Sequence, residues 1–175
     1  YFLHRGGDPF GAMTSNIRFP VQSYDWLIWG ISSMRTIEHR FMIDSLMDRQ
    51  SGLVVCDPGT CPSWWGDPDV LKTHLLERLN KIDILKCSQP EAEWLSGIPH
   101  PSEAAHWLSE QGPSVSIVTA GGDGVYYHHD DRTAHLTVEK VDAIDTTGAG
   151  DATLAGILMA LNPNVSRIDR DELTL

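Results

Sequence analysis

Short apolar runs alternate with segments of helical periodicity along most of the chain, and this alternation constrains the fold more than any other feature. Such a layout places the strands parallel, with the connecting helices packed against the sheet. We therefore predict an α/β fold. The predicted strands are short and rich in residues suited to a buried strand, and they lie at 26–29, 53–56, 82–85 and 115–119.

Three segments between these strands have helical periodicity. The first two lie at 38–49 and 69–80, and Pro68 suits the start of the second because proline costs nothing in a first helical turn. A shorter helix is predicted after Pro101, with Ser102 as its N-cap. The residues predicted to face inward are Met42, Ile43, Leu46 and Met47, then Val70, Leu71, Leu75 and Leu79, then Ala104, Ala105 and Leu108.

After Thr119 the pattern changes to that of a β-hairpin. A turn at 121–124 leads into a first strand at 125–127, and the second strand follows at 136–138. We expect the four polar residues at 128–131, two histidines and two aspartates, to form a solvated tip, and we favour this over a metal site.

Charge and composition narrow the classes of protein. The 175 residues carry 13 Lys+Arg against 24 Asp+Glu, a net charge of −11, without a basic run, which argues against a nucleic acid partner. No apolar stretch approaches the roughly 18 residues that span a bilayer, and the chain start lacks a signal-peptide layout, so we predict a cytoplasmic protein without membrane contact. Cys56, Cys61 and Cys87 lack the spacing of zinc ligands and are interpreted as reduced thiols.

The segment 141–161 carries the chemistry. Gly148 and Gly150 let the backbone approach a ligand closely, and the helix that starts here offers unpaired N–H groups and a positive dipole end to a phosphate. Asp151 faces the same space, where it could take a proton from a hydroxyl group. Alternatively, Asp151 only caps the helix and the glycines only turn the chain. The residues after Asp151 are apolar nearly all round, so we predict a buried helix that ends at Pro163.

Residues 145–151 match the motif D-T-x-G-A-G-D, and the chain thereby resembles the ribokinase-like sugar kinases of the phosphofructokinase B type. With six fixed positions at usages of roughly 5–7% each, a chance match has odds on the order of 10⁻⁷ per starting point. Residues 83–97 are similar to the family's strand, N-x-x-E and helix ending in Leu-x-Gly, and residues 117–124 to its V-T-x-G-x-x-G segment. Residues 2–5 and 55–58 resemble segments of fructokinases and 2-keto-3-deoxygluconate kinases.

The resemblance implies a three-layer sandwich around a mostly parallel sheet, here incomplete, that forms a single domain over 1–175. It implies transfer of the γ-phosphoryl group of ATP to a sugar hydroxyl with Mg²⁺, with sugar and ATP as small-molecule partners. The matching positions are Asp151 as the catalytic base, Gly148, Ala149 and Gly150 as the anion hole, Thr119, Gly121 and Gly124 at the ATP site, Glu91 at the magnesium-bound phosphates, Arg5 at the substrate, and Asp145 and Thr147 at a monovalent cation, K⁺.

Two other functions stay open. The first is a truncated or degenerate relative that binds nucleotide without catalysis. The second is a Rossmann-like dinucleotide enzyme, which we disfavour because no G-x-G-x-x-G follows an early strand. A nucleotide titration separates the three, and the sequence leaves the oligomeric state open, a homodimer included.

The chain departs from the family pattern at three places. Ser88 stands where many relatives have Asn, and residues 59–61 replace the Asn, any residue and Arg that follow Asp-Pro, so the sugar is not fixed. The resemblance covers this chain but only the middle and later part of the family's length. We therefore expect a fragment, with little or no kinase activity as an isolated chain.

Overall fold

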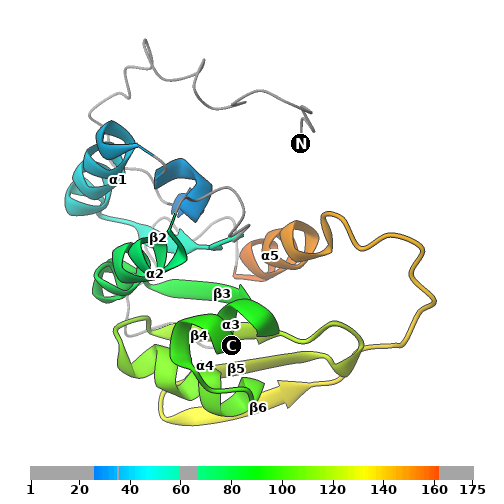
Figure 1. The fold of residues 1–175 in the computed structure, drawn as a ribbon. Helices are drawn as coiled ribbons and strands as arrows, with labels where there is room; N and C mark the ends of the chain where they lie inside the picture. The colour runs from blue at the N-terminus through cyan, green and yellow to red at the C-terminus, as the bar shows by residue number, and fades with distance from the viewer. Residues whose placement is uncertain (1–25, 35, 60–66, 162–175) are drawn as a thin grey trace.

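A six-stranded sheet forms the centre of the protein (Figure 1). The computed structural model describes residues 26–34, 36–59 and 67–161. The strands follow one another across the sheet in chain order, and the first three pairings are parallel and the last two antiparallel. This confirms the predicted α/β class and the mostly parallel sheet. The strands are β1 (Trp26–Trp29), β2 (Leu53–Cys56), β3 (Ile84–Ser88), β4 (Val115–Thr119), β5 (Val125–His129) and β6 (Arg132–Leu136).

The helices form two layers of unequal size on the two faces of this sheet (Figure 1). One face of the sheet packs against four helices and the other against a single helix. Successive strand residues point to opposite faces, so each strand contributes to both layers. In β2, for example, Val54 and Cys56 join the four-helix side, whereas Leu53 and Val55 join the other. The four are α1 (Ile37–Arg49), α2 (Pro68–Leu76), α3 (Gln89–Ser96) and α4 (Pro101–Glu110), and the single helix is α5 (Ala149–Ala160).

The predicted bounds of β1, β2 and β4 are confirmed, but the prediction for the third strand is displaced. Ile82 closes a 3₁₀ turn, Leu79–Lys81, by donating its N–H to the Leu79 carbonyl at 3.1 Å, so β3 begins only at Ile84. The same turn ends α2 early, and Val70 is 45% exposed rather than inward-facing.

The N-cap prediction for α4 is wrong. His100 occupies the N-cap and Pro101 the first helical position, where its fixed backbone angle and missing N–H suit it. Ser102 therefore lies inside the helix. The three inward-facing residues predicted for this helix are buried: Ala104, Ala105 and Leu108.

The hairpin is present, but its tip is shorter than predicted. Asp130 and Asp131 alone connect β5 and β6, and both have positive φ angles, 48° and 58°, as a two-residue hairpin turn requires. The two histidines therefore belong to β5. His128 is buried at 6% exposure, with Nδ1 at 2.8 Å from the Thr133 hydroxyl and Nε2 at 3.4 Å from Nδ1 of His106 on α4.

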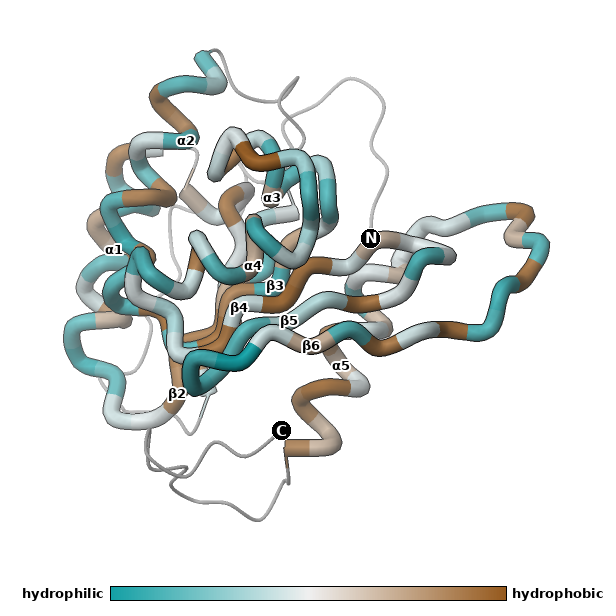
Figure 2. Tube along the Cα trace, turned by 90° about the horizontal axis from the view of Figure 1, so that it is seen from below, coloured by the Kyte–Doolittle hydropathy of each residue, from teal (hydrophilic) through white to brown (hydrophobic). Residues whose placement is uncertain are grey.

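Helix α5 is not the buried helix that its composition predicts. Leu154 is buried, and Ile157 and Leu158 pack beside it on the sheet, whereas Met159 on the opposite side is 77% exposed. Apolar residues nevertheless run along the helix (Figure 2). A helix that is apolar on all sides is expected to be covered on both its faces. The described residues cover only the face of α5 that packs on the sheet. The helix ends at Ala160, and Pro163 lies outside the described residues.

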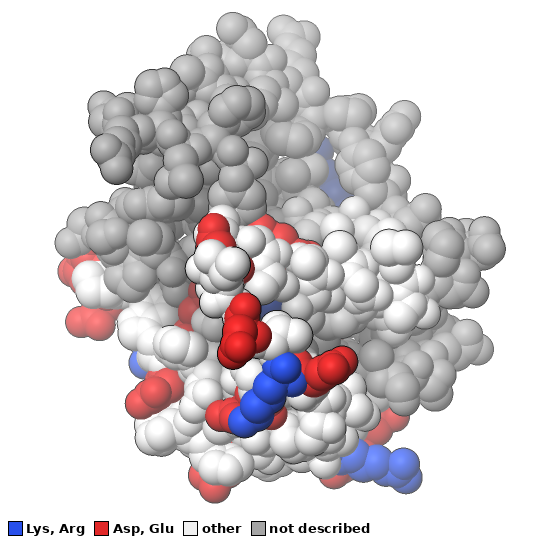
Figure 3. Space-filling view, turned by 90° about the vertical axis from the view of Figure 1, so that its right-hand side faces the viewer, with Lys and Arg blue, Asp and Glu red and all other residues white. Residues whose placement is uncertain are grey.

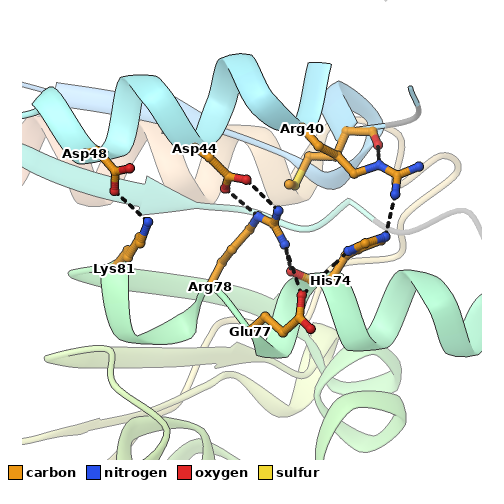
Figure 4. Close-up of polar contacts among 8 residues, drawn as sticks. Arg40, Asp44, Asp48, His74, Glu77, Arg78 and Lys81 are labelled. Carbon is orange, nitrogen blue, oxygen red and sulfur yellow. Dashed lines mark hydrogen bonds and ion pairs between the residues drawn. The ribbon is translucent and has the colours of Figure 1, made fainter. Parts of the chain in front are cut away.

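Ion pairs join α1 to the segment that follows α2 (Figure 4). The guanidinium of Arg78 donates to both carboxylate oxygens of Asp44, at 2.8 and 2.7 Å, and its side chain is only 10% exposed. Lys81 pairs with Asp48 nearby, at 40% and 59% exposure. In the described ranges, none of the helices is both long and apolar enough to cross a bilayer.

The two ion pairs should differ in their effect on stability. We expect Arg78→Met to lower the free energy of unfolding by about 2–3 kcal/mol, because it leaves the half-buried Asp44 without its bidentate partner. Lys81→Met is the matched control and should cost less than about 1 kcal/mol, because solvent screens the exposed pair. Urea denaturation of both variants measures the difference. Equal losses would contradict this account.

His128 should make stability depend on pH. Burial lowers the pKa of His128, and the neighbouring His106 lowers it further, while Asp131 and Glu110 oppose the shift. The unfolded chain therefore binds a proton more readily than the folded one, so stability should fall as pH decreases through about 6.5.

Thermal melts between pH 5 and 8 test this expectation. We expect His128→Gln to flatten the pH dependence, and His39→Gln on α1 controls for the loss of an imidazole elsewhere. An unchanged slope in His128→Gln would show that another group is responsible.

Candidate active site

The candidate site lies where the parallel strands end. Asp57 follows β2, Ser88 ends β3 and Thr119 ends β4, so their positions meet at one edge of the sheet. Ser88 and Thr119 are direct partners in the β3–β4 register. Ligands of α/β sheets bind outside the carboxyl ends of the strands. The helix that approaches this edge on the less covered face is α5 (Figure 1).

Lys86 is the central charged group of this edge. Ile84 belongs to the apolar cluster on the α5 side of the sheet, and Lys86, two residues later, points to the same side. Its ammonium is 2.7 Å from the Asp57 carboxylate, with the two side chains 5% and 14% exposed. A β-carbon added to Gly150 in the first turn of α5 would lie 2.7 Å from the same Nζ. The ammonium is therefore packed between Asp57 and the helix start.

Three carboxylates interact electrostatically around this lysine. Burial raises the pKa of Asp57, the hydrogen bond and charge of Lys86 oppose that rise, and the negative charges of Glu91 and Asp151 add to it. Glu91 and Asp151 therefore both act on Asp57, although the three carboxylates come from different segments. The site is a compact group of charges at the strand ends.

The first turn of α5 has the geometry of an anion site. Gly148 is the N-cap with φ 81°, a left-handed conformation that favours glycine. The first N–H groups of a helix lack acceptors within it and point toward its positive dipole end. Asp151 lies in this turn and is exposed, and the N-cap position belongs to Gly148. The Ala149 N–H donates to the Thr146 carbonyl at 3.1 Å, so the turn combines its remaining N–H donors with an accessible carboxylate.

The segment before α5 is held by a local contact. The Asp145 carboxylate accepts a hydrogen bond from the Thr147 N–H at 2.8 Å, and this bond lowers the pKa of Asp145. Both residues are exposed. The structure therefore gives Asp145 a turn-capping role, and its place in a cation site stays a prediction.

Of the four residues predicted at the ATP site, two are fixed by hydrogen bonds at the strand ends and two are glycines in the turn after β4. Glu91 accepts a hydrogen bond from the Ser88 N–H at 2.8 Å, and the Thr119 hydroxyl donates to the Cys87 carbonyl at 3.3 Å, so both are fixed at the strand ends. Gly121 begins the 3₁₀ turn Gly121–Asp123, and a β-carbon there would meet open space. Gly124 differs, because a β-carbon there would lie 2.1 Å from the Leu136 carbonyl. The hairpin itself thus requires this glycine.

Arg5, the predicted substrate contact, and Cys61, interpreted as a reduced thiol, lie outside the described residues. The buried Cys56 and Cys87 are free, and burial raises the pKa of both thiols, which agrees with their interpretation as unreactive reduced cysteines. Over the described ranges, no three His, Cys, Asp or Glu side chains gather to hold a metal ion.

Sequence reasoning did not single out Lys86. The available signal was a lysine within the apolar strand Ile84–Ser88, at a position that alternation assigns to the α5 side. Its importance is local, because acidic side chains outnumber basic ones on the surface toward which the β6–α5 loop extends (Figure 3). Among the described residues, Lys86 and the start of α5 bring positive charge to the strand ends, where a negatively charged ligand could bind.

Comparison with known proteins places this geometry in a family. The model of the pfkB family carbohydrate kinases matches residues 46–167, more than two thirds of the chain. An aminoimidazole riboside kinase of Salmonella typhimurium is 27% identical over 165 residues, and a fructokinase of Rhizobium leguminosarum bv. trifolii is 34% identical over 122 residues. These matches cover 93% and 67% of this chain, and 51% and 37% of the respective relatives.

The fold is also similar to that of a solved structure of this family. The crystal structure of aminoimidazole riboside kinase from Salmonella enterica superposes with a TM-score of 0.77 at 26% identity, over 89% of this chain and 53% of that one. This similarity confirms the predicted ribokinase-like architecture. The chain spans about half, or less, of the length of the relatives it matches.

Two glycines of α5 offer a test of the turn geometry. Gly148→Ala should lower the free energy of unfolding by about 1–2 kcal/mol, because alanine is strained at φ 81° although no neighbour obstructs it. Gly156→Ala, inside the same helix and without neighbours in reach, should raise stability by up to about 1 kcal/mol. Chemical denaturation of both variants measures the signs. A neutral Gly148→Ala would show that the left-handed cap is not needed.

Proposed function

Because the chain belongs to the pfkB family of carbohydrate kinases, we propose that the protein containing it transfers the γ-phosphoryl group of ATP to a hydroxyl group of a sugar. The observation that carries this proposal is the first turn of α5, where an exposed carboxylate and helix N–H groups meet at the strand ends. A site of this kind can deprotonate a hydroxyl while it stabilises charge on a phosphoryl group.

We propose a ketose such as fructose as the first substrate class and a riboside as the second. Fructokinases and an aminoimidazole riboside kinase are among the relatives, which supports both. Asp57 and Pro58 match the fructokinase-like segment, whereas the residues at 59–61 depart from it. Arg5 stays a proposed substrate contact by its similarity to the F-x-Y-R segment.

In the proposed reaction, the substrate oxygen attacks the γ-phosphorus in line with the departing oxygen of ADP. A bond forms between the sugar oxygen and phosphorus, the bond between phosphorus and the bridging oxygen breaks, and the electron pair of that bond leaves with ADP. Asp151 accepts the hydroxyl proton. The N–H groups at Gly148, Ala149 and Gly150 are proposed to hold the phosphoryl oxygens, which agrees with their place at a helix start. The Ala149 N–H donates to the Thr146 carbonyl at 3.1 Å and would share its hydrogen between the two acceptors.

We propose that ATP lies along the strand ends beside Thr119, Gly121 and Gly124. The solved complex of the Salmonella enterica aminoimidazole riboside kinase with its substrate and an ATP analog, 27% identical, supports ATP as co-substrate. Mg²⁺ would arrive with the nucleotide, since in kinases it keeps waters and binds through phosphates. Glu91, fixed at the end of β3, would orient those waters.

We propose K⁺ as the monovalent cation, held by oxygen atoms of Asp145 and Thr147. The Asp145 carboxylate is ionised more readily than usual, because its pKa is lowered by the hydrogen bond from Thr147. A hard oxygen donor of this kind suits such an ion. The bound ion would add positive charge next to the anion site and keep the turn before α5 in place.

Asp151→Asn tests the proposed base in the full-length protein. The amide keeps the shape of the side chain but cannot accept the proton, so kcat should fall by about 10²–10⁴-fold while ATP affinity changes little. The substrates to compare are fructose, ribose, 2-keto-3-deoxygluconate and aminoimidazole riboside.

Asp69→Asn is the matched control, because Asp69 also lies in the first turn of a helix, α2, which packs on the face of the sheet opposite α5. It should leave kcat unchanged. Near-normal turnover of Asp151→Asn would remove Asp151 as the base. ATP binding without turnover of any sugar by the wild-type protein would favour a non-catalytic relative.

A further inference from the structure

Lys86 occupies a position where stability alone would favour an apolar side chain. It follows Ile84 on the α5 side of β3, and the residue is only 4% exposed. Removing an ammonium group from water is costly, and replacing a buried ion pair by apolar residues is often neutral or stabilising. The burial of Lys86 therefore calls for an explanation beyond packing.

Its surroundings supply one. The ammonium is 2.7 Å from the Asp57 carboxylate. It also lies beside Gly150, since a β-carbon added to that glycine would be only 2.7 Å from Nζ. A lysine ammonium has three N–H groups, of which Asp57 accepts one, so the other two point away from Asp57. Asp57 thus fixes the lysine against the turn that is proposed to bind the phosphoryl group.

The balance of charge points the same way. Asp57, Glu91 and Asp151 interact electrostatically at this edge, and Lys86 is bonded to one of them. Without the lysine, three carboxylates would repel the phosphates of ATP from the start of α5. With it, a positive charge lies beneath the first turn in a position screened little by solvent.

We propose that Lys86, held by Asp57, is a positioning residue for phosphoryl transfer: its ammonium fixes the first turn of α5 at Gly150 and supplies positive charge beneath the transferring phosphoryl group. This inference rests on the proposed kinase function. Lys86 acts through the N–H groups of the turn, and Asp57 acts through Lys86. The ammonium takes no part in bond making.

The test compares variants of the full-length protein on its best sugar substrate. Lys86→Met keeps the length of the side chain and removes the charge, and we expect kcat to fall by about 10²–10³-fold, as for the loss of one charge-stabilising donor. The KM for the sugar should change less than about threefold. Lys86→Arg retains the charge and should recover at least a tenth of the wild-type kcat.

Asp57→Asn distinguishes a holder of the lysine from a direct substrate contact. We expect it to lower kcat about tenfold in the wild-type background and to have no further effect in Lys86→Met, because the residue it positions is gone. The double variant, Lys86→Met with Asp57→Asn, leaves no unpaired buried charge and should fold even where Lys86→Met does not. An additive effect of Asp57→Asn would overturn the coupling.

The outcomes separate this inference from the proposed function. A wild-type protein that phosphorylates no sugar contradicts the kinase function, and the inference with it. An active wild type together with a folded Lys86→Met variant, or a double variant, of unchanged kcat overturns the inference alone. Lower thermal stability with normal kcat would likewise reduce Lys86 to a structural role.

Discussion

The central strands are buried between two apolar layers, so their side chains must alternate between the two faces of the sheet. The rest of the architecture depends on this alternation. Every second residue of β2, β3 and β4 packs toward the four-helix side and the others toward α5. Where the strands reach their carboxyl ends, the same alternation continues with polar residues. Asp57 and Lys86 lie on the α5 side because each follows, two residues later, a residue that packs there: Val55 and Ile84. The fold and the site are products of one constraint, the two-residue period of a strand.

Local signals predicted most of the fold. Strand bounds were recovered at β1, β2 and β4, whereas the second hairpin strand, predicted at 136–138, lies at Arg132–Leu136. Pro68 marked the start of α2 because proline fits a first helical turn. The errors arose where distant contacts decide. His128 was expected in a solvated tip, yet its contact with His106 on α4 cannot be read from the hairpin sequence. The exposure of α5 likewise depends on which other segments pack against it, and the amino-acid composition of the helix does not reveal those segments.

The site shows the same division. The glycines and Asp151 were predictable because they are adjacent in sequence and their chemistry follows from one helix start. Lys86 was missed because its contacts come from Asp57, 29 residues earlier, and from Gly150 in α5. Gly124 illustrates the opposite case, since the carbonyl of Leu136 on β6 already demands a glycine there. A motif position can thus reflect the fold as much as the ligand.

A chain with a net charge of −11 and a proposed ATP site raises the question of how an anion is accommodated. Exposed carboxylates are screened within a Debye length of about 8 Å at physiological ionic strength, so the distant ones contribute little at the strand ends. Groups in the low-dielectric interior act more strongly over short distances. The buried ammonium of Lys86 belongs to this second kind, and it lies beside Gly150 in the first turn of α5. The local arrangement of a few fixed positive groups, rather than the overall charge, thereby determines which ligand this edge of the sheet can receive.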